Sequence, residues 1–103
     1  MPEAMRIRAR LHGGVVEVKI QMLHAMETGL RLDANGAPIA AHFISAIVAR
    51  HGERVVLSGQ MGAAVAANPT LEFRFRGAAQ GDSITVTWVD NLGQTRTDSA
   101  TIG

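Results

Sequence analysis

The strongest constraint on the fold is a pair of alternating segments joined by two glycines. In residues 6–12 apolar side chains alternate with arginines, and in residues 16–22 they alternate with charged or polar ones. A period of two places the apolar side chains on one face of a strand, and Gly13-Gly14 supplies the positive φ angles that a tight hairpin turn needs. With His12 opposite Val15, apolar residues face apolar ones throughout, so the pattern predicts the hairpin and its register.

The remaining sequence predicts five more short strands. Apolar runs or alternation place them at residues 43–50, 54–58, 71–76, 84–89 and 94–102, and the first two are joined at either His51-Gly52 or Gly52-Glu53. Residues 24–41 break the alternation and carry a turn at Asn35-Gly36. Residues 61–67 are too short for a stable helix and are expected to form a crossing loop.

About seven short strands predict one all-β domain over residues 1–103, an immunoglobulin-like sandwich, with a small barrel as the alternative. Its core is expected to be aliphatic around a single large aromatic side chain. Trp88 shares a strand face with Ile84 and Val86, so we expect it at the centre of that core.

Composition excludes several classes of partner. Ten Lys and Arg against nine Asp and Glu give a net charge of +1, so charge predicts no nucleic-acid partner. No apolar stretch approaches the roughly 20 residues of a membrane-spanning helix, and residues 1–14 lack the apolar run of a signal peptide, so we expect neither a membrane partner nor an export signal on this chain. With no cysteine, any thiol chemistry must belong to another protein.

No catalytic, cofactor-binding or metal-binding residue is expected, and the chain is not predicted to be an enzyme. The four histidines are too far apart in sequence for a local ligand pair, the carboxylates are scattered, and no serine has the context of a nucleophile. Arg6, Arg8 and Arg10 lie on one strand face that could take an oxyanion or a nucleic-acid backbone. However, Glu17 lies opposite Arg10 and no aromatic residues are interleaved, which favours an ordinary solvated face.

Several strings of residues, in order along nearly the whole chain, closely resemble the SoxZ family. The matching strings are Met5-Arg6-Ile7-Arg8-Ala9, His24-Ala25-Met26-Glu27-Thr28-Gly29 with Arg31 and Asp33, Phe43-Ile44, Asn68-Pro69, Thr87-Trp88-Val89-Asp90-Asn91 with Gly93, and Thr95-Arg96-Thr97-Asp98. The blocks around Met26 and Trp88 are far more specific than a lone glycine pattern.

The resemblance implies a non-catalytic subunit of the SoxYZ carrier complex of thiosulfate oxidation. In that complex a C-terminal cysteine of SoxY would carry the sulfur intermediates, which agrees with the absence of cysteine here. It further implies an immunoglobulin-like sandwich, a heterodimer with SoxY, transient contact with other Sox enzymes, and a periplasmic location reached by export together with SoxY. The alternative is a stand-alone β-sandwich module that binds a small anion or a peptide.

One segment is hypothesised to be a surface for the partner or for its sulfur-carrying arm. After a regular strand, residues 24–31 concentrate polar groups around a glycine, and imidazole, hydroxyl and guanidinium groups can all donate to a partner-borne thiosulfonate. The alternative is that Glu27 and Arg31 merely pair with each other. The candidate residues are His24, Met26, Glu27, Thr28, Gly29 and Arg31.

Overall fold

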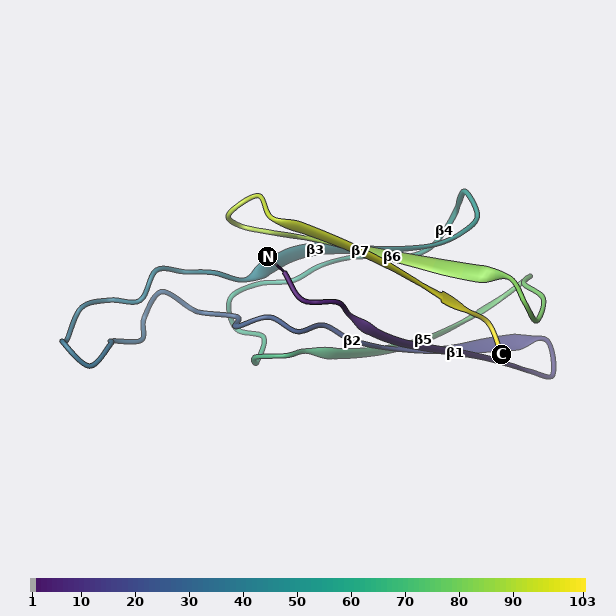
Figure 1. Ribbon diagram of the computed structural model, residues 1–103, viewed down its shortest axis with the longest axis horizontal. Coiled ribbons are helices and arrows are strands. Elements are labelled where there is room, and N and C mark those ends of the chain that lie inside the picture. The colour runs from purple at the N-terminus through teal and green to yellow at the C-terminus, as the bar shows by residue number, and fades with distance from the viewer. Residues whose placement is uncertain (1) are drawn as a thin grey trace.

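Two antiparallel sheets packed face to face form the molecule, which a computed structural model describes over residues 2–103 (Figure 1). The strands are β1 (Arg6–His12), β2 (Val15–Gln21), β3 (Ile44–His51), β4 (Arg54–Gln60), β5 (Thr70–Arg76), β6 (Ser83–Asp90) and β7 (Thr95–Thr101). The three-stranded sheet has the order β1-β2-β5, and the four-stranded sheet has the order β4-β3-β6-β7. The predicted all-β, immunoglobulin-like sandwich is confirmed. No helix that could cross a membrane occurs among the described residues.

The first hairpin has the predicted register. Ile7 pairs with Ile20, and Leu11 pairs with Val16, so apolar side chains line the inner face of both strands. Gly13 and Gly14 turn the chain with φ angles of 56° and 80°, which only glycine adopts without strain. β5 then adds antiparallel to the other edge of β2.

The second hairpin turns at Gly52-Glu53, which decides between the two alternatives left by the sequence, because His51 pairs with Arg54. β4 continues two residues beyond the predicted end at Ser58. Its last residues are polar or small and carry no strand pattern, but Gly59 and Gln60 still pair with β3. Backbone pairing, rather than side-chain alternation, therefore sets the length of β4.

The core lies between the sheets and is aliphatic around one tryptophan. Trp88 is 1% exposed and is the largest of the fully buried side chains. Its strand neighbours Ile84 and Val86 are fully buried, as predicted, and belong to the same core cluster as Val16 and Ile20 of the other sheet. Gly103 forms backbone hydrogen bonds with β1. Its N donates to the carbonyl of Ala9, and its own carbonyl oxygen accepts from Leu11 N.

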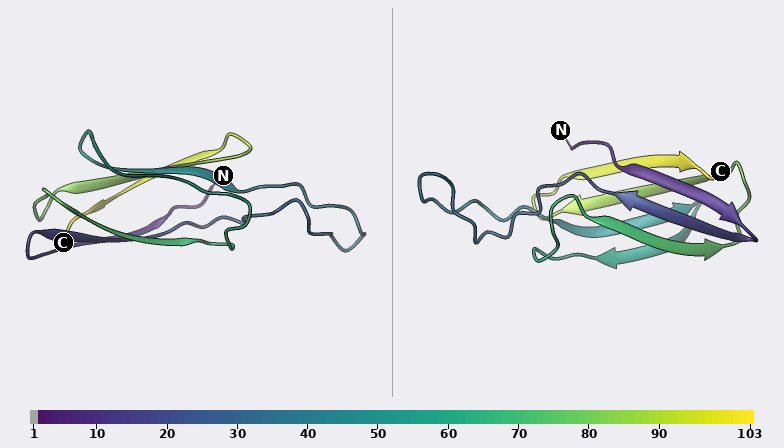
Figure 2. Two further views of the ribbon diagram at one scale, coloured as in Figure 1. Left: turned by 180° about the vertical axis from the view of Figure 1, so that it is seen from behind. Right: turned by 90° about the horizontal axis from the view of Figure 1, so that it is seen from below.

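The connection between β2 and β3 projects far beyond one end of the sandwich (Figures 1 and 2). It gives the molecule extents of 53 × 21 × 20 Å. The prediction of an irregular segment over residues 24–41 with a turn at Asn35-Gly36 is confirmed, because Gly36 N donates to Asp33 O to close that turn.

Trp88→Ala is expected to lower the free energy of unfolding by about 3–5 kcal/mol, because the cavity left in the core cannot be filled by neighbouring side chains. Urea denaturation followed by far-UV circular dichroism measures the change. Leu92→Ala is the control, since Leu92 is 60% exposed and its truncation should cost far less. Equal losses from the two variants would contradict a core built on Trp88.

Candidate functional site at the base of the projecting loop

Four segments that are distant in sequence meet at the end of the sandwich from which the loop projects. His24 and Asn68 bind each other, with His24 N donating to Asn68 Oδ1 at 3.1 Å and Asn68 N donating to His24 O at 2.9 Å. Phe43 and Asn91 form a similar reciprocal pair, at 2.8 and 2.9 Å. The Asn91 side-chain amide also donates to Ala41 O at 2.9 Å. Both ends of the loop are thereby fixed to the framework.

The carboxylate of Asp90, at the end of β6, is the centre of this junction. Asp90 Oδ2 accepts from His42 Nε2 at 2.8 Å and from His24 Nε2 at 3.3 Å. Asp90 Oδ1 accepts from the backbone amides of Leu92 at 3.0 Å and Gln94 at 2.8 Å. Asp90 is only 3% exposed, and burying a charged carboxylate costs free energy unless hydrogen bonds replace those it made to water. These four donors supply that replacement.

The donors keep Asp90 ionised. Burial by itself raises the pKa of the carboxyl, but the hydrogen bonds from His42, Gln94, His24 and Leu92 outweigh it, and the net pKa lies below the ordinary value of 3.8. A depressed carboxyl pKa stabilises the fold in full above that ordinary value, and this contribution is lost as the pH falls through the lower native value.

The two histidines differ in what they can do. His24 Nδ1 accepts from Met26 N at 3.0 Å, so the proton of the neutral ring lies on Nε2, where it is donated to Asp90. His42 binds Asp90 through Nε2, and 30% of its side chain is exposed. His24 is therefore fixed in one tautomer, whereas His42 has the ring that is partly open to solvent.

Within residues 2–103, this cluster is the one group of side chains close enough together to hold a metal ion. Ligating atoms of His24, His42 and Asp90 all lie within 4.8 Å of one another. A metal on His24 Nε2 would require the ring proton to move to Nδ1, where it would face the amide hydrogen of Met26. The hydrogen bonds therefore favour a proton, not a metal ion, between His24 and Asp90.

A shallow cavity of about 320 Å³ opens beside the cluster. His24 and Trp88 meet edge to face there, with ring centroids 5.2 Å apart, and the rings of His24 and His42 lie at 4.4 Å. Among the described residues, buried Trp88 Nε1 has no hydrogen-bond partner. The residues lining the cavity are Pro2, Glu3, Leu23, His24, Ala25, His42, Trp88 and Gln94.

The projecting segment, residues 27–42, is called the arm here. It begins at a bridge between Glu27 and His42, whose backbones exchange hydrogen bonds at 2.6 and 3.0 Å. Arg31 donates two hydrogen bonds to the Glu27 carboxylate, which lower the pKa of Glu27. Leu30 and Leu32 are 86% and 58% exposed, so the arm presents apolar side chains to solvent.

A comparison with protein-family models matches residues 5–101 to the family described as sulphur oxidation protein SoxZ. That match covers almost all of the 103 residues. The chain belongs to the SoxZ family. Its role is accordingly that of a component of the Sox system in sulfur oxidation. A search of curated proteins finds no match.

The six residues predicted to form a partner surface fall into two groups, two that are buried and four that are not. His24 and Met26 are only 7% and 5% exposed, so the expectation that they lie on the surface is corrected. His24 is held inside by Asp90. Met26 packs in the core with its sulfur accepting from Ile44 N at 3.3 Å, and its φ is 51°.

The other four predicted residues lie at the root of the arm. Glu27 and Arg31 pair, as the alternative interpretation proposed, and Thr28 Oγ1 accepts from Leu30 N. Gly29 has a φ of 87°, and a Cβ there would lie 3.2 Å from that of Ala41. His42 and Asp90 were not among the candidate residues. Asp90 lies in the matching string at residues 87–91, but 48 residues separate it from His42, so no pattern in the sequence indicates that the two meet.

Asp90→Asn is expected to lower the free energy of unfolding at pH 7 by about 1–3 kcal/mol. The amide can retain one acceptor for Leu92 and Gln94, but its NH₂ group would face the Nε2 hydrogen of His24, which Met26 holds in place. Urea denaturation at pH 7 and at pH 3 measures both the loss and its pH dependence. On going from pH 7 to pH 3, the free energy of unfolding should fall less in the variant than in wild type, because the variant lacks one carboxylate whose pKa is lowered by folding.

Asp33→Asn is the matched control. Asp33 is exposed and uses one oxygen, Oδ1, to accept from Asn35 N and Ala37 N, which an amide oxygen can also do. If Asp33→Asn lowers the free energy of unfolding as much as Asp90→Asn does, the buried hydrogen bonds of Asp90 contribute no more to stability than those of an exposed turn.

Proposed function

We propose that this chain is the non-catalytic subunit of a periplasmic SoxYZ carrier complex. In this proposal it pairs with SoxY, whose C-terminal cysteine carries sulfur intermediates during thiosulfate oxidation. Membership of the SoxZ family and the absence of cysteine support the division of labour. The saturated carboxylate of Asp90 also supports it, because an oxygen that already accepts two hydrogen bonds is a poor general base.

The observation that carries the proposal is the arm. Its two ends are joined by the bridge between Glu27 and His42 and held to the framework through the hydrogen bond of His42 to Asp90, yet the arm exposes Leu30 and Leu32. Large apolar side chains on a fixed projection favour burial against another protein. We assign the arm, with Thr28, Gly29 and Arg31 near its root, to contact with SoxY or with its sulfur-carrying segment.

Leu30→Ser with Leu32→Ser is expected to weaken association with SoxY by about a hundredfold. Burying one leucine contributes about 1.5–3 kcal/mol, and 1.4 kcal/mol corresponds to tenfold in affinity. Native mass spectrometry of the two chains mixed over a concentration series measures the complex. Circular dichroism checks that the variant remains folded.

Val55→Ser is the control, because Val55 is 49% exposed on β4 and lies outside the arm. Unchanged association in the arm variant would refute the arm as the SoxY contact. An intact complex with slower reconstituted thiosulfate oxidation would instead assign the arm to the sulfur-carrying segment of SoxY.

Export is proposed to depend on SoxY, because the two chains would act in the periplasm as one complex. In cells that lack SoxY, this chain should remain in the cytoplasmic fraction, and restoring SoxY should move it to the periplasmic fraction. Immunoblots of the two fractions, with a cytoplasmic marker as control, measure the distribution. Periplasmic accumulation without SoxY would refute joint export.

A further inference from the structure

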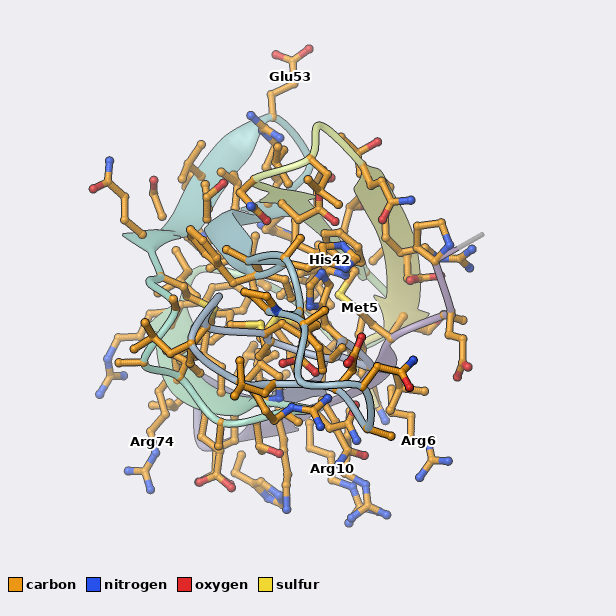
Figure 3. All side chains as sticks on the ribbon, turned by 90° about the vertical axis from the view of Figure 1, so that its left-hand side faces the viewer. Met5, Arg6, Arg10, His42, Glu53 and Arg74 are labelled. Atoms are coloured by element: carbon orange, nitrogen blue, oxygen red, sulfur yellow. The ribbon has the colours of Figure 1, made fainter. Side chains whose placement is uncertain are left out.

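The outer face of the β1-β2-β5 sheet is strongly basic although the whole chain has a net charge of only +1. Alternation along the three strands directs six cationic and two acidic side chains to this face. They are Arg6, Arg8, Arg10, Lys19, Arg74 and Arg76, with Glu17 and Glu72. Arg6, Arg10 and Arg74 all extend into solvent on the same side of the molecule (Figure 3).

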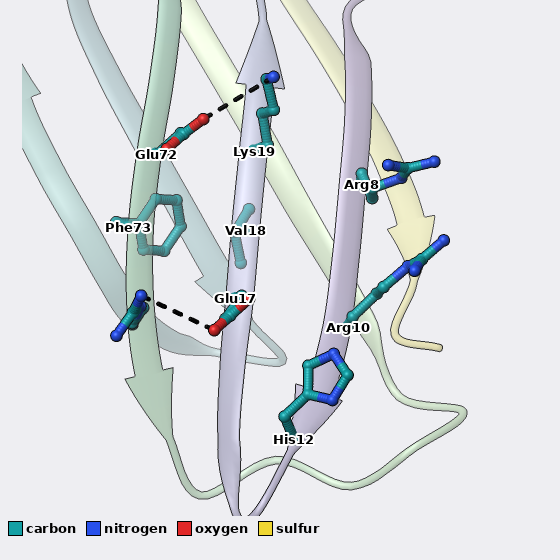
Figure 4. A pocket seen from close by; sticks show the side chains of 9 residues that line it. Arg8, Arg10, His12, Glu17, Val18, Lys19, Glu72 and Phe73 are labelled. Carbon is teal, nitrogen blue, oxygen red and sulfur yellow. Dashed lines mark ion pairs between the residues drawn. The ribbon is translucent and has the colours of Figure 1, made fainter.

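The two carboxylates neutralise only the part of this face near β5. Glu72 pairs with Lys19 and Glu17 pairs with Arg74, each at 3.8 Å. Arg8 and Arg10 extend from β1 away from both pairs (Figure 4). Across residues 2–103, neither these two nor Arg6 has an ion-pair partner.

The geometry of the row favours an extended anionic surface over a small ion. Alternate residues of a strand are about 7 Å apart, so Arg6, Arg8 and Arg10 spread their charges over about 14 Å. A small oxyanion could contact only one or two of them, and all three are exposed. The adjacent groove of about 520 Å³ has only two rings in its lining, His12 and Phe73, and Phe73 packs against the core, which disfavours stacking of successive nucleic-acid bases.

We propose that this face is a docking surface for an acidic protein surface. The arginine row of β1, Arg6, Arg8 and Arg10, supplies the unpaired charge, and the groove between β1 and β5 supplies the shape. We assign the acidic surface to the enzymes that act on SoxY-bound intermediates, and this assignment rests on the proposed function. Exposed opposite charges accelerate encounter without making the complex long-lived, which suits a carrier that must visit several enzymes.

A direct test uses labelled poly-L-glutamate as the probe and the chain alone. Fluorescence anisotropy at ionic strengths of about 0.01 M and about 0.15 M should show binding that weakens with salt, because these charges are open to screening. Arg6→Gln with Arg8→Gln and Arg10→Gln should abolish binding, whereas replacing all three with lysine should retain it. Equal binding by the glutamine variant, or tighter binding of duplex DNA or phosphatidylglycerol vesicles, would overturn the proposal.

The matched single-charge control is Arg50→Gln against Arg8→Gln. Both remove one exposed cation, but Arg50 lies on β3 in the other sheet. Only Arg8→Gln should weaken polyglutamate binding. Equal effects of the two variants would mean that net charge alone matters, and would overturn the assignment to this face.

Reconstituted thiosulfate oxidation extends the test to the complex with SoxY. The triple glutamine variant should slow oxidation by about tenfold at low salt, within the range of electrostatic steering, while native mass spectrometry shows normal association with SoxY. Loss of that association would overturn the proposal by making the face a SoxY interface. If wild type supports no oxidation, the proposed function fails, and polyglutamate binding still decides the docking surface.

Discussion

One buried carboxylate holds together the end of this molecule at which its family motifs meet. Asp90 accepts four hydrogen bonds, two from histidines at opposite ends of the β2–β3 connection and two from the turn between β6 and β7. Bringing the ends of such a loop together costs conformational entropy, and the hydrogen bonds to Asp90 help to offset that cost. The shared acceptor fixes both ends at one point, so the arm leaves the sandwich in a defined direction.

The alternation of apolar and polar residues was sufficient to predict the framework, because every strand except the end of β4 carries its own pattern. The first hairpin was predicted to the residue, since shifting it by one position would expose its whole apolar face. The junction at Asp90 could not be predicted in the same way. His24 and Asp90 are 66 residues apart, and only the folded sheets bring them to hydrogen-bond distance. The burial of Met26 was missed for the same reason.

Several of the strings that resemble the SoxZ family meet at the root of the arm. His24, Asn68 and Asn91 bind backbone groups or one another's segments, and Gly29 allows close approach to Ala41. Residues of this kind specify shape. The unpaired arginines of β1 lie on the outer face of the three-stranded sheet, and two of them, Arg6 and Arg8, belong to another of the matching strings.

The contact between Trp88 and His24 gives the protein an optical reporter of its own. Trp88 is the single tryptophan of the chain, and its indole meets the imidazole of His24 edge to face at the root of the arm. Indole emission is sensitive to the polarity and charge of the groups around it. Displacement of the arm by a bound protein would therefore alter the light emitted by one known residue, with no label attached.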